Sequence, residues 1–217
     1  MGSNDIELDF IDNIKNKNRE NRAYLRYLIG FSVVFCVSLV AGIIVSLATK
    51  NAVSDDLKAR TASHFTDVFA GCSKPADYFT VIITSSSADL RYFLLIFTSG
   101  FTFFCKYATG AMVAFKAFAV GFSSEFLFLS LKDGIISLNH PSLSFLAFVA
   151  AELLIACVIV YLSVKATLFG YDFRKLRGRK SLMLRSPTIY RYVFLFLTAI
   201  GFVIAVNAAY CGLSALI

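Results

Sequence analysis

The chain has 217 residues, of which 58% are hydrophobic and only 16% are charged, and its formal net charge is +7. A soluble domain is normally about 45–50% apolar and about 25% charged, so a water-soluble chain of this composition would expose large apolar patches. The composition therefore excludes an ordinary soluble domain. It predicts an all-α fold, a polytopic bundle of about five transmembrane helices with the lipid bilayer as its partner.

The amino-terminal segment, 1–27, is polar and contains charges of both signs, so we expect a cytoplasmic tail. A first span follows at about 28–49, a stretch without charge that is long enough to cross roughly 30 Å of hydrocarbon. A cleaved signal peptide is the alternative, because Ser46-Leu47-Ala48 resembles a cleavage site. The apolar stretch is longer than the usual signal core of about 7–15 residues, which favours a retained span.

Residues 50–89 carry mixed charges and are expected to form an outer loop. Within this loop, five apolar residues fall on one helical face: Val53, Leu57, Phe65, Val68 and Phe69. Such a pattern predicts an amphipathic helix on the membrane surface, although an ordinary solvated helix has the same pattern.

The apolar stretch 90–131 is too long for one span, so we expect two spans, at about 90–107 and 112–131, joined by a tight turn. Lys106 and Lys116 would flank this turn, with their charged heads reaching the interface. After a short polar turn, a fourth span is expected at about 142–164. The fifth span is expected at about 192–217, after a basic loop at 165–191.

The distribution of basic residues predicts the orientation. Residues 1–27 contain five Lys and Arg, and residues 165–191 contain eight, so both segments are expected in the cytoplasm. Four predicted spans separate the two segments, and this even number places both on the same side of the membrane. The fifth span then places the carboxyl terminus outside, in a protein of the cell (cytoplasmic) membrane. The basic loop either only fixes this orientation or also binds anionic lipid head groups. Its candidate residues are Arg174, Lys175, Arg177, Arg179, Lys180 and Arg185.

Small residues at four-residue spacing predict close helix packing, because helices in lipid approach one another most closely where side chains are small. The first span contributes Ser38, Gly42 and Ser46, the third contributes Ala117 and Gly121, and the fifth contributes Gly201, Ala205 and Ala209.

Two carboxylates, Glu125 and Glu152, lie inside predicted spans, where a charge costs roughly 2.5–3.5 kcal/mol. We expect them to approach each other across the bundle. They would form either a proton or cation site, because two nearby carboxylates do not both ionise cheaply, or only hydrogen bonds to neighbouring helices. Asn207 in the fifth span predicts an interhelical hydrogen bond rather than a ligand contact.

Signals of catalysis are weak. Neither a zinc-protease motif nor a phosphate-binding loop occurs, and His64 and His140 fall in expected outer loops. We therefore expect no enzyme activity, no catalytic residues, no metal and no cofactor. Cys72 and Cys211 are both expected near the outer side, either as free thiols or as a bridge.

Residues 115–122 (FKAFAVGF), with Phe126-Leu127 and the upstream run 95–100 (LIFTSG), resemble the central stretch of the stage II sporulation protein M family. The layout of spans and loops is also similar. This chain departs from the family pattern at Ala117 and Glu125, where glycine is frequent, and at Tyr107, near which a proline is usual.

The resemblance implies a non-catalytic membrane scaffold that acts in forespore engulfment. The implied partners are peptidoglycan-degrading proteins similar to stage II sporulation proteins D and P. The alternative is a small transporter or channel component that uses Glu125 and Glu152 as a proton-linked or cation-linked site. The sequence does not give the oligomeric state.

Overall fold

A computed structural model of the protein describes residues 3–49, 60, 63, 65–68, 72, 75–136, 140–176 and 187–216. All regular secondary structure in these ranges is helical, which confirms the predicted all-α bundle. The long helices are α1 (Ser3–Thr49), α3 (Pro75–Ser99), α4 (Cys105–Lys132), α5 (Pro141–Leu176) and α7 (Pro187–Leu216). Each contains a segment that is long and apolar enough to cross a membrane.

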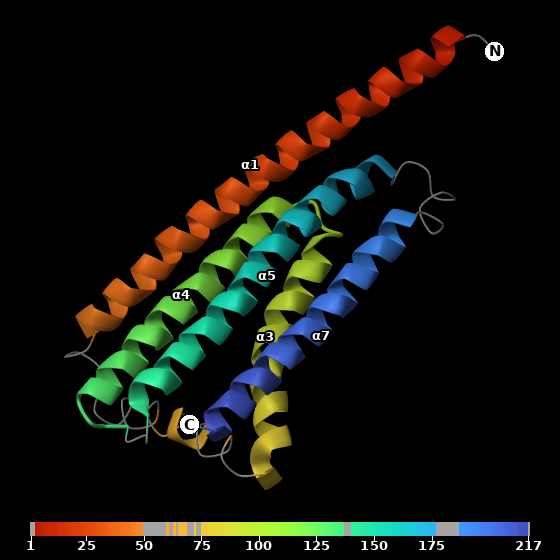
Figure 1. Ribbon diagram of the computed structural model, residues 1–217. Coiled ribbons are helices and arrows are strands. Elements are labelled where there is room, and N and C mark those ends of the chain that lie inside the picture. Colours follow the sequence, from red (N-terminus) through yellow and green to blue (C-terminus); the bar gives the residue numbers. More distant parts are fainter. Residues whose placement is uncertain are drawn as a thin grey trace.

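Helices α3, α4, α5 and α7 form a bundle, and α1 lies along the outside of it, mainly against α4 (Figure 1). We call the end of the bundle that holds the turn between α3 and α4 the upper end. There α5 ends and α7 begins, and the amino-terminal part of α1 extends beyond it (Figure 1). The carboxyl terminus lies at the opposite, lower end. The helices therefore alternate in direction, as the predicted topology requires.

The second span differs from its predicted bounds. Helix α3 begins at Pro75 rather than near residue 90, and ends at Ser99, before the turn that we placed near residue 107. Each of the three prolines in the chain is the first residue of a helix. Proline suits this position, because its fixed φ is helical and its missing N–H has no partner to lose there. Pro75 therefore marks a helix start that the charges nearby obscured.

The first and fourth helices also run past their predicted ends. Helix α1 continues through the whole of the predicted tail from Ser3, and α5 extends to Leu176, into the predicted basic loop. Part of the predicted outer loop is likewise packed. Phe65 and Val68 lie against the lower end of the bundle, where the Phe65 ring meets that of Phe148 edge-on at 5.6 Å. Val53, Leu57 and Phe69 lie outside the described residues.

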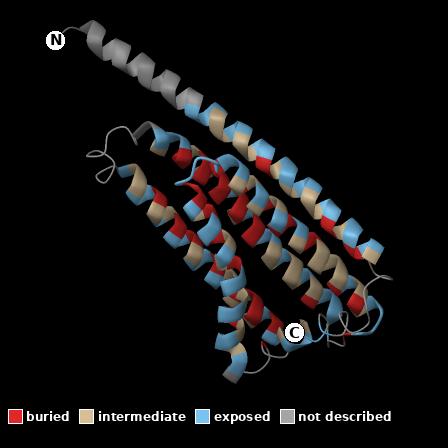
Figure 2. Ribbon diagram, turned by 180° about the vertical axis from the view of Figure 1, so that it is seen from behind, coloured by how far each residue is buried: buried red, intermediate tan, exposed pale blue. Residues whose placement is uncertain are grey.

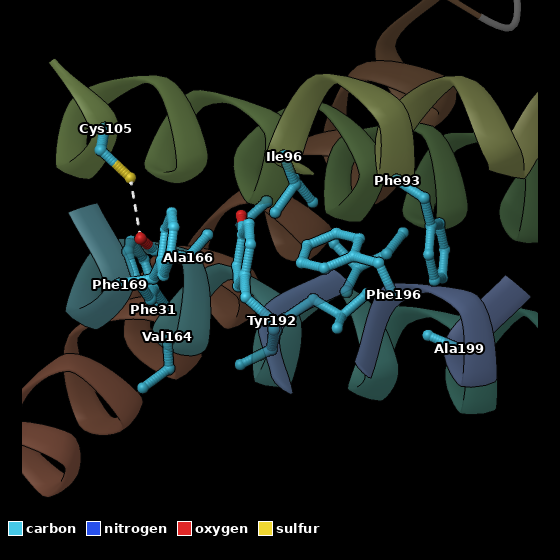
Figure 3. Packing of buried hydrophobic residues seen from close by; sticks show 14 of the residues in the cluster. Phe31, Phe93, Ile96, Cys105, Val164, Ala166, Phe169, Tyr192, Phe196 and Ala199 are labelled. Carbon is cyan, nitrogen blue, oxygen red and sulfur yellow. Dashed lines mark hydrogen bonds between the residues drawn. The ribbon is translucent and has the colours of Figure 1, made fainter. Parts of the chain in front are cut away.

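Aromatic side chains fill the upper half of the bundle core (Figure 3). The rings of Phe169 and Tyr192 stack with centroids 4.0 Å apart, and Tyr192 donates a hydrogen bond from its hydroxyl to the Phe97 carbonyl oxygen at 3.1 Å. The nearby Gly100 has no room for a side chain, because a Cβ there would lie 2.9 Å from Tyr192 Cζ. The turn between α3 and α4 is thus fitted closely against α7.

Two glycines allow α1 and α4 to touch backbone to backbone. A Cβ on Gly42 would collide with the Phe118 carbonyl oxygen and lie 2.9 Å from the Phe122 nitrogen. A Cβ on Gly121 would collide with the Leu39 carbonyl oxygen and lie 3.0 Å from the Leu39 carbonyl carbon. Ser46 and Ala117, from the same predicted stripes, are also buried, and Ser38 is partly buried. The packing faces predicted for the first and third spans are correct.

The stripe predicted on the last helix is wrong. Gly201, Ala205 and Ala209 are exposed, and a Cβ on Gly201 would have no neighbour within 4 Å. Helix α7 instead packs through a face that includes Phe196, Val203 and Asn207. This face combines large side chains with small ones such as Ala199 and Ser214, and it is not the face of the predicted stripe.

The outward surface of the helices is apolar. Many large hydrophobic side chains are exposed there, among them Val37, Phe115 and Phe194, while the buried residues lie mainly between the helices (Figure 2). A surface of this kind is unfavourable in water and is matched by lipid tails.

Candidate functional site

A triad of charged side chains lies inside the bundle. Lys116 on α4 places its Nζ 2.6 Å from Asp89 Oδ1 on α3 and 2.7 Å from Glu152 Oε2 on α5. Lys116 and Asp89 are almost completely buried, at 6% and 4% exposed, and Glu152 is partly buried. Three helices are therefore joined at one ammonium group.

Lys116 was expected to reach the membrane interface, and that prediction is wrong. It lies eleven residues into α4, about 16 Å along the helix axis from the upper end of that helix, which is near the middle of a bilayer core. Leaving this ammonium in lipid would be costly, and its side chain is too deep to extend to the interface. The two carboxylates supply the charge partners that the interface would otherwise provide.

Asp89 is the member of the triad that the sequence analysis missed. We assigned it to the outer loop, because residues 50–89 carry mixed charges. Two signals in the sequence could have indicated Asp89. Pro75 marks the start of a helix that includes it, and Lys116 and Glu152 need charged partners once both lie in spans. A carboxylate on a third helix satisfies that need.

A cavity of about 270 Å³ adjoins the triad. Asp89, Lys116 and Glu152 line it together with Ser85 and Asn207, and Phe65, Val68, Phe148 and Tyr210 also lie in its wall. Asn207 donates a hydrogen bond from Nδ2 to Ser86 Oγ at 3.2 Å, linking α7 to α3. The predicted interhelical bond of Asn207 is confirmed.

The triad is electrostatically unbalanced when all of its groups are ionised, because two carboxylates surround one ammonium. Burial makes each charge expensive, and only close pairing offsets that cost. The remaining negative charge favours a further cation at the site. The arrangement suits either a fixed ionic joint between three helices or a site for a small cation.

Glu125 does not join Glu152, contrary to our expectation. It lies nine residues further along α4 than Lys116, about 14 Å along the helix axis. Its side chain is partly buried, and no contact between Glu125 and Glu152 is found among the described residues. The predicted pair of carboxylates is replaced by Asp89 and Glu152, with a lysine between them.

Of the six candidate head-group residues in the predicted basic loop 165–191, the structure describes the side chain of Arg174 alone, and Arg174 lies in α5. Arg174 donates a hydrogen bond from Nε to the Gly170 carbonyl oxygen at 3.0 Å, and its guanidinium lies 5.6 Å from the centroid of the Phe103 ring. Lys175 is in α5, and its side chain is not described. Arg177, Arg179, Lys180 and Arg185 lie outside the described residues.

At the lower end, Cys72 and Cys211 are buried against each other, and their sulfur atoms lie 2.7 Å apart as free thiols. Burial raises the pKa of the Cys72 thiol, and the neighbouring Cys211 raises it further. The described residues contain no group of three or more His, Cys, Asp or Glu side chains arranged to hold a metal ion.

Five long apolar helices, with one charged triad buried between three of them, define a multi-pass helical membrane protein. A scan against protein-family models and searches of curated proteins and of solved structures find no match.

Proposed function

We propose that this chain is a non-catalytic assembly component of the cell membrane, of the stage II sporulation protein M type, with its amino terminus in the cytoplasm. The proposal is supported by the positions of residues in the two segments that resemble the family, 95–100 and 115–122, because three of them hold helices together. Gly100 fits the turn beneath Tyr192, Lys116 joins three helices, and Gly121 admits α1 to the surface of α4.

These residues build the bundle and offer no reactive group. Lys116 is held by two carboxylates, and the two glycines have no side chain. A motif of this kind is suited to maintaining a rigid platform in the membrane. In this proposal, the lipid-facing helix surfaces and the outer segment between α1 and α3 hold the partners.

The partners that the resemblance implies are peptidoglycan-degrading proteins. The test is purification of the tagged chain from membranes of its native cells after chemical crosslinking, with identification of what accompanies it. Recovery of cell-wall hydrolases is expected. The variant Gly121→Leu, which should displace α1, is expected to reduce that recovery, whereas the matched variant Gly201→Leu on the open face of α7 is not. Equal recovery with both variants, or no hydrolase at all, would count against a scaffold.

The cavity beside the triad favours a second candidate, a transporter component that moves a proton or small cation. Its test is flux into lipid vesicles that contain the purified chain. Flux with the native protein, lost in Glu152→Gln while the variant stays folded, would support transport. Background flux in both would favour the assembly component.

A further inference from the structure

A groove of about 650 Å³ lies between α1 and α4 near the upper end of the bundle, separate from the triad. Two cations, Arg26 on α1 and Lys106 on α4, line it. Both are exposed, and neither forms an ion pair with a carboxylate of the described residues. None of the described residues that line the groove is acidic, so these residues present two positive charges without a negative partner.

Below the cations, the lining of the groove is apolar, and two glycines, Gly30 and Gly110, leave it open. Arg26, Gly30 and Val34 follow one another at four-residue spacing, so they lie on one face of α1. Lys106 and Gly110 have the same spacing on α4. A Cβ on Gly30 would have no neighbour within 4 Å, and one on Gly110 would meet only Phe31 Cε1, at 3.6 Å.

The position of the groove matches the boundary between head groups and acyl chains. Lys106 is the second residue of α4, at the membrane end of that span, whereas Val34 lies well inside the span of α1. A groove with cations at the interface and an apolar floor beneath them complements a molecule with an anionic head and a hydrocarbon tail. Basic pockets between transmembrane helices bind such head groups in other membrane proteins.

We propose that this groove binds one anionic phospholipid, with its phosphate between Arg26 and Lys106 and one acyl chain along Gly30 and Val34. The lipid fills the space that the two glycines leave between α1 and α4. It thereby joins the outer helix to the bundle at the upper end, where α1 and α4 lack the direct backbone contact that Gly42 and Gly121 provide further down.

Native mass spectrometry of the detergent-purified full chain tests the proposal, with phosphatidylglycerol and phosphatidylcholine of the same acyl chains as probes. We expect one phosphatidylglycerol to be retained in preference to phosphatidylcholine. The double variant Arg26→Gln/Lys106→Gln is expected to bind it about thirtyfold more weakly, at about 1 kcal/mol for each cation lost.

Filling the groove should have a similar effect without changing charge. Gly30→Leu is expected to weaken phosphatidylglycerol binding, whereas two controls should leave it unchanged: Gly201→Leu, another open glycine, and Arg191→Gln, another exposed cation at the upper end. Equal retention of phosphatidylcholine, or unchanged binding in the double variant and in Gly30→Leu, would overturn the proposal. So would displacement of the lipid by an equal concentration of glycerol phosphate, which would indicate an anion site without an acyl chain.

Discussion

Lys116 and Glu152 lie on neighbouring helices that run in opposite directions, and their charged atoms meet at 2.7 Å in the interior of the bundle. Asp89 closes the arrangement from a third helix. Each of these charges alone would make its helix expensive to hold in lipid. In the triad, the free-energy cost of burying each charge is offset only when the other two helices are correctly placed. The triad can therefore specify how the helices pair.

The first prediction is that Lys116→Met destabilises the bundle. The substitution leaves the buried Asp89 and the partly buried Glu152 close together without a counter-charge. Breaking a buried ion pair in this way costs roughly 3–5 kcal/mol. Thermal unfolding in detergent, followed by circular dichroism because the chain contains no tryptophan, measures the loss. The control is Arg91→Met, which removes an exposed cation from α3. Equal melting temperatures for both variants would contradict the role given to Lys116.

The second prediction concerns the contact between α1 and α4. Gly121→Ala places a methyl group against the Leu39 carbonyl, and overpacking of this kind costs roughly 1–3 kcal/mol. Gly201→Ala adds the same methyl group where nothing lies within 4 Å, so its stability should be unchanged. Detergent-induced unfolding of the two variants under identical conditions gives the comparison. A Gly121→Ala protein as stable as the control would show that the helices are not in backbone contact.

The third prediction is that a disulfide bond can be formed between Cys72 and Cys211, which are free thiols in the structure. Mild oxidation with copper phenanthroline and oxygen removes two protons and two electrons from the pair and forms one disulfide. An alkaline buffer should speed the reaction, because burial raises the pKa of Cys72 and the thiolate is scarce at neutral pH. Cleavage between the two residues followed by non-reducing electrophoresis detects the link. It should be absent in Cys72→Ser, and its absence from the native chain would contradict the packing of the lower end.

The sequence predicted what depends on overall hydrophobicity and on local spacing. The existence of five spans follows from apolar stretches, and the packing faces at Gly42 and Gly121 follow from small residues four apart. It did not predict features that depend on distant partners. Asp89 and Lys116 each resemble a charge near the end of a span, because their neutralisation is visible only when α3, α4 and α5 are side by side. Gly201 has the spacing of a packing residue, but only the folded structure shows that none of the described residues packs against it.

The fourth prediction concerns topology. Single cysteines at Phe103 and Ile135, in a cysteine-free background, lie at opposite ends of α4 and are exposed. In intact cells, a membrane-impermeant maleimide should label Ile135→Cys and leave Phe103→Cys unlabelled until the cells are opened, because the basic upper end is proposed to be cytoplasmic. Labelling of both positions from outside would show that α4 does not cross the membrane.

The central claim is that three charges are kept inside the membrane because they neutralise one another and hold the bundle together. The most direct test compares the free energy of unfolding of Lys116→Met with that of the triple variant Asp89→Asn/Lys116→Met/Glu152→Gln in the same detergent. Removing all three charges should restore much of the stability lost with the lysine alone, because no unpaired charge remains buried. A triple variant as unstable as the single one would contradict the claim.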